Sequence, residues 1–124
     1  MKKILHIEDD SVFARMSKVR LEEDGKYAVE YLETGIYAIG AVKKQNPDLI
    51  LLDLQLPDKD GFQILREIKA DKETSGIPVV ILTKAELDKD MEKSMELKAD
   101  AYLSKSQVTF SGCMVCIEDI LKKR

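Results

Sequence analysis

The sequence has 124 residues and carries 20 Lys and Arg against 23 Asp and Glu, which gives a formal net charge of −3. A chain of this length forms one domain, and its 44% of hydrophobic residues suffice for a core without disulfides or structural metals, which excludes intrinsic disorder. A slightly acidic chain with no stripe of Lys and Arg is also a poor match for direct binding to nucleic acid or anionic lipid.

Short apolar runs alternate with longer stretches of helical periodicity along the chain. The runs cover residues 4–7, 27–31, 49–52, 79–82 and 101–103. The third and fourth runs are continuously apolar, as expected for strands buried on both faces of a sheet. This alternation predicts an α/β fold, a single (βα)5 domain over residues 1–124 in which helices cover a parallel five-stranded sheet.

Apolar spacing also predicts which side of each helix faces the sheet. In chain order, the predicted helical faces are Val12, Met16 and Val19; Ile36, Ile39 and Val42; Phe62, Leu65 and Ile68; Leu87, Met91 and Met95; and Phe110, Cys113, Met114, Ile117, Ile120 and Leu121. Gly25 ends the first helix and Pro47 follows the second. The last face is the most regular, and three cations follow it, which suits a helix C-terminus.

Polar side chains follow four of the predicted strands. In open parallel sheets, ligands bind beyond the carboxyl ends of the strands, where the strand order reverses. The residues at these ends are Glu8, Asp9, Asp10, Asp53, Thr83, Ser104 and Lys105. A single acid in such a place is usually a helix cap, as we expect for Asp10, or a solvated loop charge. If the first and third strands are neighbours, however, three carboxylates converge with a hydroxyl and an ammonium group.

Clustered carboxylates raise one another's pKa unless a cation is present, and an all-oxygen cluster suits Mg²⁺. Asp53 ends the most apolar run, 49–52, so its carboxylate is rigidly placed. A carboxylate in that position can attack phosphorus and form an acyl phosphate. Mg²⁺ and Lys105 would neutralise charge, and the Thr83 hydroxyl would bond a phosphoryl oxygen. The set predicts a metal-assisted phosphoryl site.

Four segments, ILHIEDD, PDLILLDLQLPDKDG, IPVVILT and ADAYLSK, occur in this order and at separations that resemble the receiver domain of two-component response regulators. The resemblance covers essentially the whole chain. It implies the CheY-like, flavodoxin-like three-layer sandwich with strand order 2-1-3-4-5.

The resemblance also implies a role for each matching residue. Asp53 would be the phosphoacceptor and a metal ligand. Glu8 and Asp9 would be the acidic pair that holds Mg²⁺, and the backbone carbonyl of Gln55 would complete the protein ligands.

On the opposite side of the site, the resemblance makes Thr83 the switch hydroxyl and Lys105 the lysine of the active site. Tyr102 would be the aromatic residue whose rotamer reports phosphorylation. The sequence departs from the usual family residues at Lys84, Lys98 and Ser106. Lys84 would either crowd the phosphoryl entrance or contact the phosphate, and Ser106 stands where proline is usual. Lys98 stands where glycine commonly ends the fourth helix.

Other polar residues have simpler interpretations. His6 lies inside an apolar strand and is expected to be a core imidazole with satisfied hydrogen bonds, so the chain is a phosphoacceptor and not a histidine kinase. Cys113 belongs to the apolar face of the last helix, so its Cys-x-x-Cys spacing with Cys116 indicates core packing and not a redox pair. Asp58 and Asp60 are expected in a turn and at a helix N-cap.

The resemblance implies that a sensor histidine kinase or histidine phosphotransfer protein phosphorylates Asp53. A protein target would then recognise the surface formed by the fourth helix, fifth strand and fifth helix. We expect no enzyme: the nucleotide-binding loops are missing, and Asp53-Leu54-Gln55 lacks the second Asp of aspartyl phosphatases. A flavin phosphate would be repelled by the acidic first loop. Two alternatives stay open, a phosphorylation-independent binding module and the receiver part of a longer regulator or hybrid kinase.

Nothing in the sequence indicates membrane insertion. The apolar run after Lys2 and Lys3 ends at Glu8, too early for a secretory signal, and no run is long enough to span a membrane. Two cysteines near one end do not make a disulfide framework. The sequence therefore predicts a cytoplasmic protein.

Overall fold

A computed structural model describes residues 1–84 and 87–123 of the chain. Its elements, in chain order, are β1 (Lys2–Ile7), α1 (Ser11–Glu22), β2 (Tyr27–Leu32), α2 (Ala38–Gln45), β3 (Leu49–Leu52), α3 (Gly61–Ala70), β4 (Val79–Thr83), α4 (Asp88–Glu96), β5 (Ala101–Ser104) and α5 (Phe110–Lys122). Every predicted strand is present, with small differences at the ends. The predicted alternation of strands and helices is confirmed.

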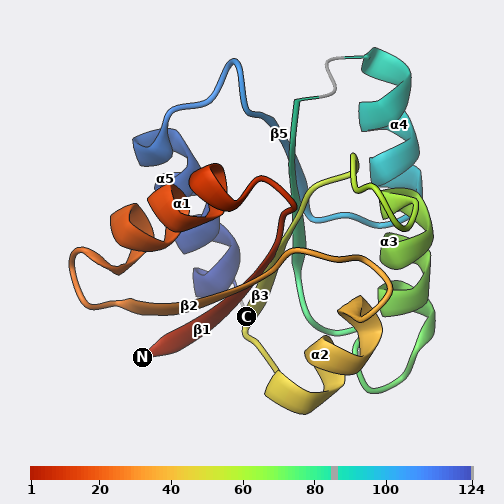
Figure 1. Cartoon of the computed structure of the whole chain (residues 1–124), viewed down its shortest axis with the longest axis horizontal. Coiled ribbons are helices and arrows are strands. Elements are labelled where there is room, and N and C mark those ends of the chain that lie inside the picture. Colours follow the sequence, from red (N-terminus) through yellow and green to blue (C-terminus); the bar gives the residue numbers. More distant parts are fainter. Residues whose placement is uncertain (85–86, 124) are drawn as a thin grey trace.

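The strands form one parallel sheet in the order β2-β1-β3-β4-β5, as predicted (Figure 1). The chain starts inside the sheet with β1, adds β2 at one edge, and then returns past β1 to add β3, β4 and β5 on the other side. The order therefore reverses between β1 and β3, and the carboxyl ends of these two strands are neighbours. This is the place where a ligand site is expected in such a sheet.

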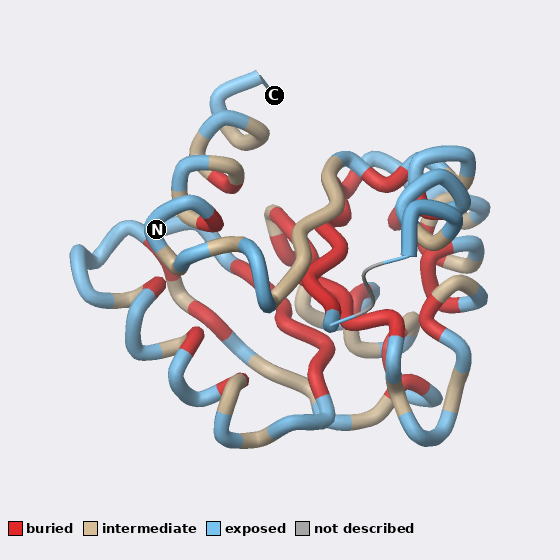
Figure 2. Tube along the Cα trace, turned by 90° about the horizontal axis from the view of Figure 1, so that it is seen from above, coloured by how far each residue is buried: buried red, intermediate tan, exposed pale blue. Residues whose placement is uncertain are grey.

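Alternate side chains of the strands point to opposite faces and build two cores. One core contains Leu5, Ile7, Ile50, Leu52, Val79 and Ile81 together with residues of α2 and α3. The other contains Ile4, Leu49, Leu51, Val80 and Leu82 together with residues of α1 and α5. Figure 1 shows the resulting three layers, with α1 and α5 on one side of the sheet and α2, α3 and α4 on the other. Buried residues concentrate in the strands and on the inner sides of the helices (Figure 2).

The predicted buried face of α1 is wrong. Val12, Met16 and Val19 are 51% to 63% exposed, and the buried residues are Ala14, Ser17 and Leu21. The buried side of α1 thus carries two small residues and one leucine, and the predicted apolar face turns outward.

The predicted face of α4 is wrong in the same way, since Leu87, Met91 and Met95 are 42% to 55% exposed. The residue of α4 that is buried is Ser94, whose hydroxyl donates to the carbonyl oxygen of Asp90 at 2.8 Å. The buried side of α4 thus carries a small polar residue instead of the large apolar residues that periodicity predicted.

The remaining helices follow the prediction more closely. In α2, Val42 is buried, but Ile36 precedes the helix and is exposed. In α3 and α5 the predicted residues are buried or half-buried. Lys98, after α4, has a φ of +72°, so a lysine occupies the left-handed position at a helix end that glycine most often takes.

The outer edge of β2 is closed by side chains of α1. The amide of Val29 donates to the Glu22 carboxylate at 2.8 Å, and the Lys18 ammonium donates to the carbonyl oxygen of Val29. Lys18 and Glu22 also form an ion pair at 3.0 Å. The pair therefore satisfies backbone groups that a neighbouring strand would otherwise bond.

Candidate phosphoacceptor site

Backbone hydrogen bonds continue past the ends of the strands and fix the residues that follow them. The backbone amide of Glu8 donates to the carbonyl oxygen of Leu32 at 2.9 Å, and that of Asp53 donates to the carbonyl oxygen of Ile7 at 3.0 Å. The backbone amide of Lys105 donates to the carbonyl oxygen of Thr83 at 2.9 Å. Since each of these groups is held by a neighbouring strand, Glu8, Asp53 and Lys105 start from rigid positions at the same edge.

Three predicted carboxylates meet at this edge. Oxygen atoms of Glu8, Asp9 and Asp53 lie within 4.8 Å of one another. Glu8 and Asp53 are buried, with 0% and 3% exposure, whereas Asp9 is exposed. Gln55 and Lys84 line the same hollow. The arrangement has two inner acids and an outer one that faces the opening.

Asp53 has different neighbours on its two oxygens. Its Oδ1 accepts a hydrogen bond from the Thr83 hydroxyl at 2.9 Å and one from the Gln55 amide at 3.0 Å. Its Oδ2 faces the Lys105 ammonium at 3.2 Å. These contacts hold the carboxylate in one orientation at the end of β3.

Lys105 joins the two inner acids. Its Nζ bonds Glu8 Oε1 as well as Asp53, and its side chain is only 6% exposed. A buried ammonium between two buried carboxylates neutralises part of their charge. Sequence reasoning placed Lys105 opposite the acids but did not foresee that it would bridge them. The peptide bonds of the described residues are all trans, the Lys105–Ser106 bond included.

The environment of Glu8 favours its protonated form. Burial, the largest influence, raises the pKa of Glu8 to about 7, with Lys105 opposing the rise and Asp53 adding to it. Glu8 Oε2 also accepts the amide of Asp10 at 3.2 Å. The site thus holds more negative charge than Lys105 alone compensates, and its donors are all oxygens, which fits a hard divalent cation.

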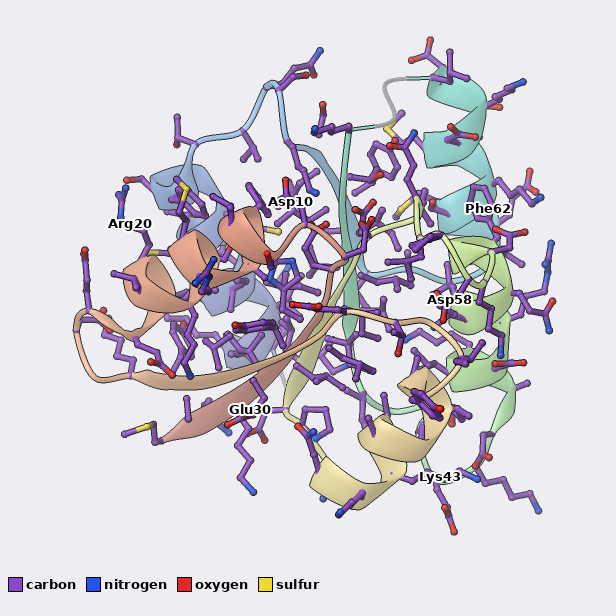
Figure 3. The ribbon with its side chains drawn as sticks, viewed as in Figure 1. Asp10, Arg20, Glu30, Lys43, Asp58 and Phe62 are labelled. Atoms are coloured by element: carbon purple, nitrogen blue, oxygen red, sulfur yellow. The ribbon has the colours of Figure 1, made fainter. Side chains whose placement is uncertain are left out.

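Asp10 is the N-cap of α1, as predicted. Its Oδ1 accepts the amides of Val12 and Phe13, both at 3.1 Å, and these bonds, above all that of Phe13, lower the pKa of Asp10. Figure 3 shows Asp10 at the start of α1. The cap holds the first turn of the helix beside the acidic cluster.

His6 is buried as predicted, but the expected hydrogen bonds are not made. Both ring nitrogens are buried and lack a hydrogen-bond partner among the described residues. Glu8 Oε1 lies 3.8 Å from Nε2, beyond hydrogen-bond distance. Burial lowers the pKa of His6 to about 3, and the Lys105 ammonium acts in the same direction, so the imidazole is neutral.

The loop acids play structural roles. Asp60 caps α3, accepting the amide of Phe62 at 3.0 Å, as predicted. Asp58 accepts the amides of Gly35 and Ile36 at 2.8 and 3.0 Å, so it ties the loop before α2 to the loop before α3 (Figure 3).

The two cysteines are not a reactive pair. Cys113 is buried in the core and Cys116 is half-buried, and both thiols are free. Burial raises the pKa of Cys113 to about 12, which keeps it in the unreactive thiol form. The predicted packing role is confirmed for Cys113.

Comparisons with known proteins identify the family. The model of the response regulator receiver domain matches residues 4–109. The transcriptional regulator RpaA of Synechocystis is 36% identical over 105 residues, which are 85% of this chain and 43% of RpaA. The response regulator Rcp1 of the same organism is 36% identical over 114 residues, 86% of this chain and 78% of Rcp1. The chain thus spans less than half the length of RpaA.

Solved structures agree. A CheY-like receiver domain protein from Methanospirillum hungatei superposes with a TM-score of 0.90 at 26% identity, covering 99% of this chain and 95% of that one. The Mn(2+)-bound form of Rcp1 superposes with a TM-score of 0.80 at 33% identity, covering 99% and 88%. The chain belongs to the response regulator receiver domains, a family of phosphorylation-accepting signalling domains. None of the described helices is long and apolar enough to cross a membrane.

Proposed function

We propose that Asp53 accepts the phosphoryl group and that residues 1–124 act as one receiver domain. The observation that supports this most directly is the placement of the Asp53 carboxylate, which is buried, held by Thr83 and the Gln55 amide, and flanked by Glu8 and Asp9. An Asp53 oxygen attacks phosphorus while the bond from phosphorus to the donor's histidine nitrogen breaks, and the leaving imidazole takes up a proton. Water later cleaves the acyl phosphate and returns the carboxylate and inorganic phosphate.

We propose Mg²⁺ as the cation of this site. Glu8, Asp9 and Asp53 would hold it, with the backbone carbonyl of Gln55 as a further ligand. The three carboxylates and the raised pKa of Glu8 fit a hard divalent ion. When bound, Mg²⁺ neutralises the charge that builds up on the phosphoryl oxygens. Lys105 contributes a second cation, and the Thr83 hydroxyl donates to a phosphoryl oxygen once Asp53 is modified.

The phosphoryl donor in this proposal is a sensor histidine kinase or a histidine phosphotransfer protein in the cytoplasm. The response passes through α4, β5 and α5 to a protein target. Leu87, Met91 and Met95 form an exposed apolar stripe on the α4 side of this surface, and Tyr102 lies half-buried on β5. Direct contact of this domain with nucleic acid is not part of the proposal, since the chain is slightly acidic. It acts as a signalling domain and not as an enzyme on other molecules.

Phosphorylation of Asp53 can be tested directly. Incubation with Mg²⁺ and acetyl phosphate should add one phosphoryl group, detected by intact mass spectrometry and removed by hydroxylamine. Asp53→Asn should take up none. Asp60→Asn is the matched control, because Asn caps a helix as well as Asp does, and it should be phosphorylated like the wild type.

Phosphate uptake by Asp53→Asn would refute the assignment. If the wild type took up none and yet bound its partner, the domain would be the phosphorylation-independent binding module instead.

The raised pKa of Glu8 predicts a pH-dependent metal affinity. Because Glu8 must lose its proton to bind a cation, the Mg²⁺ dissociation constant should rise about tenfold from about pH 8 to about pH 6. Without cation, stability should fall as pH rises from 4.5 through about 7, since the folded state keeps a proton that the unfolded chain has released. Calorimetric titration of Mg²⁺ at several pH values measures the affinity.

Glu8→Gln is the control for this measurement, since it has no proton to release and should bind Mg²⁺ weakly and without this pH dependence. Equal affinity of the wild type at both pH values would contradict the prediction.

A further inference from the structure

The Lys105 ammonium has a third neighbour besides its two carboxylates. Its Nζ lies 4.4 Å from the centroid of the Phe13 ring, over the face of the ring. Because the Lys105 side chain is only 6% exposed, this contact is made away from water. Cation–π attraction is strongest under such conditions, and an aliphatic residue in the first turn of α1 would not provide it.

The Phe13 ring is itself held in place from several sides. It stacks on Phe110 in the first turn of α5, with ring centroids 5.7 Å apart and an interplanar angle of 25°. The His6 ring meets it edge-on at 6.0 Å and 76°. Its backbone amide is bonded to the Asp10 cap. The ring therefore forms a rigid platform beside the acidic cluster.

The platform has room next to it. A small hollow is lined by Phe13, Leu82, Lys105, Val108, Thr109, Phe110 and Cys113. The ammonium-bearing side chain and both rings border this space, so there is free volume beside the Lys105 contact. The Arg20 guanidinium lies over the Phe110 ring, 5.3 Å from its centroid. Each of the two stacked rings thus has a cation over its face.

Binding of a divalent cation at the acidic site would change the contacts of Lys105. Glu8 Oε1 bonds its ammonium here, and the same carboxylate would hold the divalent cation in the function proposed above. The ammonium and the divalent cation would then share one carboxylate, so metal binding weakens the attraction between Glu8 and Lys105. A buried ammonium that loses an anionic partner needs another site, or it moves out to water.

We propose that Phe13 is a positioning residue for Lys105. This inference rests on the proposed function. Its aromatic face would hold the ammonium when Glu8 binds the divalent cation, and would so keep Lys105 next to Asp53. Phe110 supports Phe13 through their stacking contact.

The contact can be followed without phosphorylation, through the NMR signals of the Lys105 side chain. Protons above an aromatic face are shifted upfield, so the ε-methylene signal of Lys105 should lie upfield of those of exposed lysines. Titration with Mg²⁺ alone should leave this upfield shift in place or increase it. Phe13→Leu should abolish the shift, and Phe13→Tyr should retain it.

The functional readout is the rate of phosphorylation by acetyl phosphate at saturating Mg²⁺. Phe13→Leu should slow it by about fivefold or more, and Phe13→Tyr should restore it, because the aromatic attraction is kept. Urea unfolding of both variants identifies any loss of folded protein, and rates are compared where each is fully folded. A purely structural role would lower stability but leave the phosphorylation rate of the fully folded Phe13→Leu variant at the wild-type value.

In the wild type, an ε-methylene signal that moves to the exposed value when Mg²⁺ binds would overturn the proposal. A fully folded Phe13→Leu variant with the wild-type phosphorylation rate would overturn it as well. These outcomes differ from failure of the proposed function, in which the wild type itself takes up no phosphate while its Lys105 signal still reports the contact with Phe13.

Discussion

Replacing Lys105 by Met should destabilise the cation-free domain by about 3 kcal/mol at about pH 8. The substitution leaves Glu8 and Asp53 buried without the ammonium that joins them. The loss should be smaller at about pH 6, because the folded state then holds a proton on Glu8 and has less charge to compensate. Saturating Mg²⁺ should recover most of the lost stability, since it supplies positive charge to the same carboxylates.

Urea unfolding with and without Mg²⁺ at the two pH values measures these effects. Lys105→Arg, which keeps the charge, should lose less than Lys105→Met. Lys72→Met, at an exposed position, should change stability by less than about 0.5 kcal/mol at either pH. A Lys105→Met variant that is equally stable at both pH values would show that Lys105 does not compensate the negative charge of Glu8 and Asp53.

Replacing Gly61 by Ala should cost about 3 kcal/mol of folding free energy. A Cβ atom at Gly61 would overlap the Cα of Leu54 and lie 2.8 Å from its carbonyl oxygen. These are backbone atoms, so no side-chain rotation relieves the overlap. Because Leu54 directly follows Asp53, the shift should also displace the Asp53 carboxylate, the proposed phosphoacceptor, and the rate of phosphorylation should fall with the stability.

Gly40 provides the matched control, because it lies inside α2 and a Cβ there meets nothing within 4 Å. Gly40→Ala should raise stability by about 0.5 to 1 kcal/mol through better helix propensity and should leave phosphorylation unchanged. Urea unfolding and acetyl phosphate labelling of both variants test the pair. A Gly61→Ala variant as stable as the wild type would mean that the contact between α3 and the end of β3 can relax.

The sheet and the gathering of acids were predictable because they depend on local pattern and on a general property of parallel sheets. Runs of apolar residues marked the strands, and the carboxyl ends of neighbouring strands meet by construction. Helix periodicity was a poorer guide. It assumes that the larger apolar side is buried, whereas α1 and α4 turn Ala14, Ser17 and Ser94 inward.

Details of the site were beyond sequence reasoning because they depend on side-chain directions from distant segments. The contact of Lys105 with the ring of Phe13 joins residues that no local pattern relates. Within the described part of the chain the His6 ring makes no hydrogen bond, and this depends on what surrounds the ring in three dimensions. Phe13 was outside the predicted face of α1, and only its aromatic character and its place next to the acidic loop hinted at a role.

The closure of β2 has a consequence for how this domain behaves when it is crowded. A strand from another molecule could pair with β2 at Val29 only after the contacts of Lys18 and Glu22 with the Val29 backbone were broken. Both charged groups would then lose these partners. Surface ion pairs add little to the free energy of folding, yet this pair hinders edge-to-edge aggregation through β2.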